Sequence, residues 1–206
     1  MTTLCEIMNK YGSDKGNGWH NYTITYHELF ENKRNEKLNI FELGLGTNNT
    51  SIPNNMGVNG KPGASLRGWK EYFWNSDIYG ADIDRSILFN EERIKTFYCD
   101  VTSEEEIKKM WQNESLKNLM FDIIVDDGLH LFDANMNFFK FSIHKLNDGG
   151  TYICEDLSFN TVNSFNNIID TLRTEYPNMT FEIKIIPSNI NHLDNNLLIV
   201  KKNGNK

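Results

Sequence analysis

The sequence predicts an α/β fold in which a mostly parallel sheet of seven strands is closed by a C-terminal antiparallel hairpin. Apolar runs rich in β-branched residues alternate with segments of helical periodicity between residues 38 and 175, as βαβ units require. The first run leads into Gly44-Leu45-Gly46, a turn typical of the start of a nucleotide-binding unit. The last two runs, 181–186 and 197–201, leave no room for a crossover helix, so they must pair antiparallel.

Length and composition limit the function classes. The 206 residues suit one domain, 1–206, whose first 36 residues form a helical, lid-like segment. A net charge of -7 without basic clusters argues against nucleic acid or an anionic membrane as partner. The cysteines Cys5, Cys99 and Cys154 are odd in number and form no C-x-x-C pair, which favours buried free thiols in a reducing compartment. Because no signal-like N-terminus and no long apolar stretch is present, we expect a cytoplasmic protein.

The N-terminal segment combines two short helices, near 2–10 and 22–30, with a glycine-rich loop at 11–18. Glycines in such a loop permit close approach to a ligand. A mobile terminal loop is the alternative reading.

The first strand, 38–46, carries the unusual residue Glu42 among apolar neighbours, where a carboxylate is costly unless it has a partner. Gly44 and Gly46 would let backbone N–H groups approach a cofactor, although Asn49 stands where a third glycine is expected. The polar loop 47–62 reads as a binding loop or a tolerated insertion. Ser65 is a plausible cap for the helix that follows.

The next strands also end in acids. Strand 77–84 carries Asp82, and an acid at this point of a nucleotide-binding fold accepts hydrogen bonds from ribose hydroxyls. Strand 94–99 is followed by Asp100, and Ser103 starts a helix in the manner of a capping box.

The central strand, 120–126, ends in Asp126, Asp127, Gly128 and His130. Ligands of open α/β sheets bind beyond the carboxyl ends of such strands, although an Asp-Asp-Gly turn and a helix cap explain the same residues. A helix at 132–146, stopped by Gly149-Gly150, precedes a fifth strand at 151–156 that ends in Glu155 and Asp156. A further helix is expected at about 162–175.

These segments resemble the class I S-adenosylmethionine-dependent methyltransferases, which share a Rossmann-like sheet with such a hairpin. More narrowly, they resemble the metal-dependent sugar O-methyltransferases of the macrolide mycinose pathway. The resemblance is carried by Tyr-Gly-Ser-Asp-Lys at 11–15, Glu-Leu-Gly-Leu-Gly at 42–46, Gly-Ala-Ser-Leu-Arg-Gly-Trp at 63–69, Tyr-Gly-Ala-Asp-Ile-Asp at 79–84, Asp-Asp-Gly-Leu-His at 126–130 and Glu-Asp-Leu at 155–157.

The resemblance implies a role for each matching residue. Contacts to S-adenosylmethionine fall to Glu42, Gly44, Gly46, Ser65, Asp82, Asp100 and Asp126, with Ser13 and Lys15 from the lid. A divalent metal, Mg²⁺ or Mn²⁺, is implied at Asp127, Glu155 and Asp156. His20 and Tyr22 are expected at the acceptor, and the catalytic residues are Asp127 with His130 as general base.

Elementary chemistry agrees with this assignment. Three carboxylates at one rim repel one another unless a cation neutralises them, and an all-oxygen set suits Mg²⁺ or Mn²⁺ better than Zn²⁺. A metal-bound sugar hydroxyl would lose its proton more easily, and His130 could accept it. Leu129 and Leu131 depart from the family pattern at the acceptor site.

We therefore expect a Mg²⁺-assisted O-methyltransferase that acts on a sugar hydroxyl, free, nucleotide-linked or glycosidic, in a homo-oligomer, a dimer. The alternatives are a methyltransferase for another small phosphorylated or phosphoramidate-type metabolite and a non-catalytic binding module. A dinucleotide-dependent oxidoreductase fits less well, because the third glycine is missing and the hairpin closes the sheet.

Overall fold

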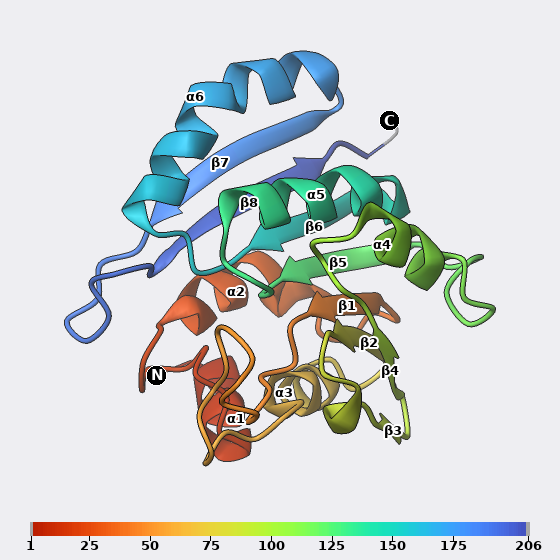
Figure 1. Cartoon of the computed structure of the whole chain (residues 1–206), viewed down its shortest axis with the longest axis vertical. Helices are drawn as coiled ribbons and strands as arrows, with labels where there is room; N and C mark the ends of the chain where they lie inside the picture. Colours follow the sequence, from red (N-terminus) through yellow and green to blue (C-terminus); the bar gives the residue numbers. More distant parts are fainter. Residues whose placement is uncertain (1, 205–206) are drawn as a thin grey trace.

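The computed structural model describes residues 2–204, which form an eight-stranded sheet with helices on both faces (Figure 1). The strands are β1 (Asn39–Leu43), β2 (Asp77–Asp82), β3 (Asn90–Glu91), β4 (Ile94–Tyr98), β5 (Phe121–Asp126), β6 (Leu146–Cys154), β7 (Met179–Ile185) and β8 (Asn196–Lys202). The helices are α1 (Thr3–Tyr11), α2 (Tyr22–Phe30), α3 (Ala64–Tyr72), α4 (Glu104–Trp111), α5 (Phe132–Ser142) and α6 (Phe159–Glu175).

The strand order is β3-β4-β2-β1-β5-β6-β8-β7. Strands β4, β2, β1, β5 and β6 run parallel, whereas β8 pairs antiparallel with both β6 and β7. The predicted parallel sheet with a C-terminal hairpin is therefore confirmed. The sequence did not predict β3, a two-residue strand that pairs antiparallel with β4 at the outer edge.

Two apolar layers fix the sheet from opposite sides. Helices α1, α2 and α3 pack on one face through large buried side chains such as Tyr22, Tyr26 and Trp69. Helices α4, α5 and α6 cover the other face, where Trp111 and Phe138 pack near β1 and β5. With both faces covered, ligands can reach the parallel strands only at their ends.

The glycine pair at 149–150 does not end a helix, as the sequence predicted, but lies within strand β6. Helix α5 already ends at Ser142, a short 3-10 turn follows, and β6 begins at Leu146. Gly149 therefore lies inside a strand, with a φ of +75°. The pairing register of β5 with β6 shifts between Phe121 and Ile123, which is the irregularity that a glycine permits in a strand.

Helix starts follow the sequence in one case and depart from it in another. Ser103 caps α4, because its hydroxyl accepts a hydrogen bond from the backbone N–H of Glu106. Ser65 does not cap α3, whose N-cap is Gly63 in the left-handed conformation. None of the helices described between residues 2 and 204 is long and apolar enough to cross a membrane.

Candidate active site

A cavity of about 280 Å³ opens at the carboxyl ends of the central parallel strands. The N-terminal loop and loop 47–62 form part of its wall. Most of the residues that the sequence singled out line it, namely Ser13, Lys15, Gly44, Gly46, Ser65, Asp82, Asp100, Asp127, His130 and Asp156. The sheet register brings these positions together, because Leu43 of β1 lies beside Asp126 of β5, and Asp126 lies beside Cys154 of β6.

The predicted ribose acid lies at the β2 end of the cavity. Asp82 accepts hydrogen bonds from the backbone N–H groups of Leu45, at 2.7 Å, and Asp84, at 2.8 Å. These bonds fix the carboxylate against the glycine turn. Asp100 lines the same cavity, and its carboxylate accepts hydrogen bonds from Thr102.

Glu42, which the resemblance places at the cofactor, does not line the cavity. Its side chain is fully buried in β1 and accepts hydrogen bonds from the Ser65 hydroxyl and the Trp69 indole N–H. The unusual acid inside an apolar strand thus has partners, one of which is itself a cavity residue.

Asp126 requires a correction, because its side chain does not line the cavity. The carboxylate accepts hydrogen bonds from the Asn135 amide and the Tyr152 hydroxyl, both at 3.1 Å, on the face covered by α5. Burial raises the pKa of Asp126 to about 6. Of this pair, only Asp127, which follows the last residue of β5, lines the cavity.

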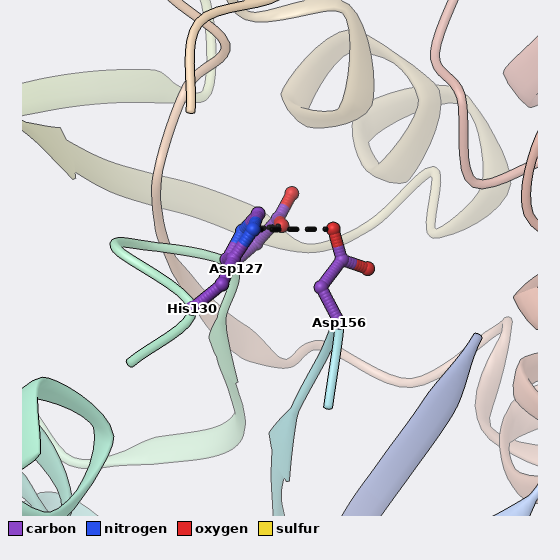
Figure 2. A group of neighbouring side chains, drawn as sticks. All are labelled: Asp127, His130 and Asp156. Atoms are coloured by element: carbon purple, nitrogen blue, oxygen red, sulfur yellow. Dashed lines mark hydrogen bonds and ion pairs between the residues drawn. The ribbon is translucent and has the colours of Figure 1, made fainter. Parts of the chain in front are cut away.

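Three side chains meet where β5 and β6 end (Figure 2). His130 Nε2 lies 3.2 Å from Asp127 Oδ1, and His130 Nδ1 lies 3.5 Å from Asp156 Oδ2. One ligand atom from each residue falls within 4.8 Å of the others, a spacing suited to a common metal ion. His130 and Asp156 both adopt a positive φ, at +57° and +55°, a conformation that costs about 1–2 kcal/mol outside glycine.

The charges in this group shift its titration. Burial alone would lower the pKa of His130, but the charges of Asp156 and Asp127 raise it to about 10. Burial would raise the pKa of Asp127, but the charge of Lys15 and the His130 hydrogen bond lower it to about 2. For Asp156, burial is the largest effect on the pKa of the carboxyl, and it raises that pKa to about 6. The imidazole is therefore held in its cationic form by two carboxylates.

Glu155 lies outside this group, on the far side of Lys15. Its Oε2 atom is 2.5 Å from Lys15 Nζ, and its other oxygen accepts a hydrogen bond from the Tyr26 hydroxyl. Glu155 is 1% exposed. Lys15 also contacts Asp127 Oδ2, at 2.5 Å, so the lysine lies between two of the three carboxylates predicted to bind metal.

His20 and Tyr22 lie behind Asp156 and do not line the cavity. The Tyr22 hydroxyl donates to Asp156 Oδ1 at 2.8 Å, and His20 Nε2 is 3.5 Å from the same oxygen. Both residues are buried, and their rings stack with centroids 4.7 Å apart. Their observed contacts orient Asp156, whereas the sequence predicted contacts with the acceptor.

Four residues that support the site were not predicted. Asn191 and Asn195 hold His20 from the loop between β7 and β8, each at 3.2 Å from His20 Nδ1. Asn54 donates to the backbone carbonyl of Leu129, which ties loop 47–62 to the turn that carries His130. Tyr26, whose hydroxyl donates to Glu155, lies four residues after Tyr22, and this helical spacing is the signal that both hydroxyls point the same way.

Gly44 lies so close to the backbone of Asp127 that no side chain fits between them. A Cβ atom at Gly44 would lie 1.8 Å from the Asp127 carbonyl oxygen, and the φ of +87° is itself unfavourable for alanine. We expect Gly44→Ala to lower the melting temperature and to weaken S-adenosylhomocysteine binding by more than about tenfold, because Asp127 must move. Thermal unfolding and calorimetric titration measure both effects.

Gly149→Ala is the matched control for this substitution. Its φ of +75° is similar, but no atom lies within 4 Å of the added Cβ. It should cost only the backbone strain of about 1–2 kcal/mol and leave ligand binding intact. Equal losses of ligand binding in both variants would contradict the role assigned to Gly44.

Comparison with known proteins gives relatives of one kind. No protein-family model matches the chain. It is 30% identical over 154 residues to the 8-demethyl-8-alpha-L-rhamnosyl tetracenomycin-C 2'-O-methyltransferase of Streptomyces olivaceus, a match that covers 75% of this chain and 37% of the relative. It is 29% identical to the mycinamicin VI 2''-O-methyltransferase of Micromonospora griseorubida, over 75% of this chain and 36% of the relative. The chain thus spans little more than a third of the length of these curated relatives.

Solved structures agree on the fold. The methyltransferase MycE of mycinamycin biosynthesis, in complex with Mg, S-adenosylhomocysteine (SAH) and mycinamycin VI, superposes with a TM-score of 0.74 at 24% identity. That match covers 98% of this chain and 55% of MycE. The fold is therefore the Rossmann-like fold of class I methyltransferases, and the similarity to sugar O-methyltransferases expected from the sequence motifs is confirmed.

Proposed function

We propose that this chain is an S-adenosylmethionine-dependent, Mg²⁺-assisted O-methyltransferase that methylates a hydroxyl of a sugar or sugar conjugate. The observation that carries the proposal is the meeting of Asp127, His130 and Asp156 on the wall of the cavity at the carboxyl ends of the strands. Two carboxylates and an imidazole are thereby combined with space for a ligand. The similarity to enzymes named as O-methyltransferases supports the same reaction class.

The donor set fits a hard divalent cation. Asp127 and Asp156 offer carboxylate oxygens within one group, which are the ligands that Mg²⁺ and Mn²⁺ prefer. Asp127 and Asp156 would hold Mg²⁺ or Mn²⁺, whereas Glu155, the third ligand predicted from the sequence, is paired with Lys15. The cation would lower the pKa of a coordinated sugar hydroxyl.

His130 would remove the proton from that hydroxyl. Methyl transfer to oxygen releases one proton, and His130 is an imidazole on the cavity wall. The two carboxylates that raise its pKa are those that a cation would neutralise, so cation binding would favour the neutral imidazole that a base requires. Asp156, held by Tyr22, would keep the imidazole oriented.

The cofactor would lie along the glycine turn. S-adenosylmethionine would supply an electrophilic methyl group on a sulfonium. Gly44 and Gly46 would lie along its methionine part, Asp82 would bind the ribose, and Asp100 would lie by the adenine; all four residues line the cavity. Ser13 and Ser65 complete the wall of the cavity from the N-terminal loop and α3.

Removal of divalent ions tests the proposal. We expect treatment with a chelator to abolish methyl transfer to a glycoside acceptor, and Mg²⁺ or Mn²⁺ to restore it. A series of acceptors that each lack one hydroxyl should identify the methylated position, because a single member will be inert. Turnover that continues undiminished without divalent ions would contradict the cation-assisted mechanism.

The remaining expectations concern partners and location. We propose a cytoplasmic enzyme with a small-molecule acceptor and no nucleic-acid or membrane partner, assembled as a homo-oligomer, a dimer. The acidic net charge of -7 and three buried free cysteines support this view. Ultracentrifugation measures the oligomeric state directly.

A further inference from the structure

Lys15 is a charged residue that is almost fully buried at the cavity wall. Its side chain is 1% exposed although it belongs to the loop between α1 and α2. The ammonium contacts Asp127 and Glu155, each at 2.5 Å, and lies 3.8 Å from Glu42. These acids stand at or just beyond the ends of β5, β6 and β1, so one lysine from the N-terminal loop joins three strand ends.

This arrangement is more specific than charge neutralisation requires. One carboxylate would match the charge of the Lys15 ammonium, but the ammonium contacts two, Asp127 and Glu155, on different strand ends. Asp127 uses one oxygen, Oδ2, for Lys15 and the other, Oδ1, for His130. The lysine contact therefore determines the direction in which Oδ1 points.

We propose that Lys15 is a positioning residue: its buried ammonium pairs with Glu155 and turns Asp127 so that the free edge of that carboxylate faces His130 and Asp156. The inference rests on the proposed function only in expecting a divalent cation at Asp127 and Asp156. It reassigns Lys15, which the motif resemblance placed at the cofactor, to the orientation of a metal ligand.

The surface pair of Lys10 and Glu71 provides a contrast within the same segment. Its atoms are 2.6 Å apart, but the side chains are 60% and 36% exposed. Exposed ion pairs contribute little, because water solvates both charges when the pair is broken. At Lys15, loss of the ammonium would leave Glu155 buried without its cation, which is strongly unfavourable.

The test uses four variants, Lys15→Met, Glu155→Gln, the two combined and Lys15→Arg, and one control, Lys10→Met. All are measured by thermal unfolding and by Mn²⁺ titration followed by electron paramagnetic resonance. Lys15→Met should lower the melting temperature by on the order of 10 °C. Lys15→Met combined with Glu155→Gln should recover at least half of that loss, because the uncompensated carboxylate is gone. Lys10→Met should change neither measurement.

Mn²⁺ affinity separates positioning from simple neutralisation. In Lys15→Met and in the double variant we expect Mn²⁺ binding to weaken by about 10–100-fold, as when the partner that orients a metal ligand is removed. Lys15→Arg, which keeps the charge and its donors, should bind Mn²⁺ more tightly than Lys15→Met. Mn²⁺ binding in the double variant that equals or exceeds the wild-type affinity would overturn the inference.

The two proposals fail in different ways. If the wild-type protein binds no Mn²⁺, the cation-assisted function is wrong. The unfolding data then still decide the pairing, because additive losses from Lys15→Met and Glu155→Gln would show that these residues are not coupled, which overturns the present inference.

Discussion

Replacing Asp127 by asparagine is expected to reduce methyl transfer by on the order of 10³-fold or more. The residue is the centre of the site, with Lys15 on one oxygen and His130 on the other. The amide keeps the shape but loses the charge, so the attraction to a cation and to the Lys15 ammonium both fall. Turnover at saturating cofactor and Mn²⁺ titration measure the two consequences.

Asp133→Asn is the matched control for this variant. Asp133 lies in the first turn of α5, six residues along the same segment, and is exposed. The substitution removes an equal charge without touching the cavity, so activity should stay within about twofold. Asp127→Asn with normal turnover would exclude Asp127 as a metal ligand and as part of the catalytic group.

Replacing His130 is expected to lower turnover by about 10²–10⁴-fold while S-adenosylhomocysteine binding is kept. Asparagine is the best replacement, because His130 has a φ of +57° and asparagine tolerates the left-handed region better than other non-glycine residues. The fall should appear in the rate constant of the chemical step, since the imidazole would act on the acceptor proton.

His144→Asn controls for the loss of an imidazole. His144 is an exposed residue in the 3-10 turn after α5, and its substitution should leave the rate unchanged. If His130→Asn retains a near-normal rate across the pH range, another group must take the proton, and the assignment of His130 as the base is wrong.

The sequence predicts the sheet well, because long apolar runs and glycine turns report burial and chain reversal directly. The strand ends, and hence the place of the cavity, follow from the same signals. It placed both Asp126 and Asp127 at the site, whereas only Asp127 lines the cavity. Both adjoin the same turn, and only the register of β5 with β1 and β6 determines which carboxylate faces the ligand.

Side-chain contacts between residues that are far apart in the sequence cannot be predicted from these local patterns. Lys15 lies in a motif that the sequence singled out, but its partners depend on how far a flexible side chain extends and on where α1 and α2 place the loop. The pair at Gly149-Gly150 was read as a helix stop because glycine favours both a helix end and an irregular strand, and the tertiary pairing of β6 decides.

The hydrogen bonds of Asn191 and Asn195 with His20 have a consequence for the order in which the protein folds during synthesis. The two sides of this contact are separated by more than 170 positions along the chain, and the contact between Lys15 and Glu155 spans 140. While only the first strands have left the ribosome, the pocket is incomplete, and its charged residues lack their partners from the later part of the chain. The site can form completely only after the β7–β8 hairpin has been synthesised, so its formation should be a late event in folding.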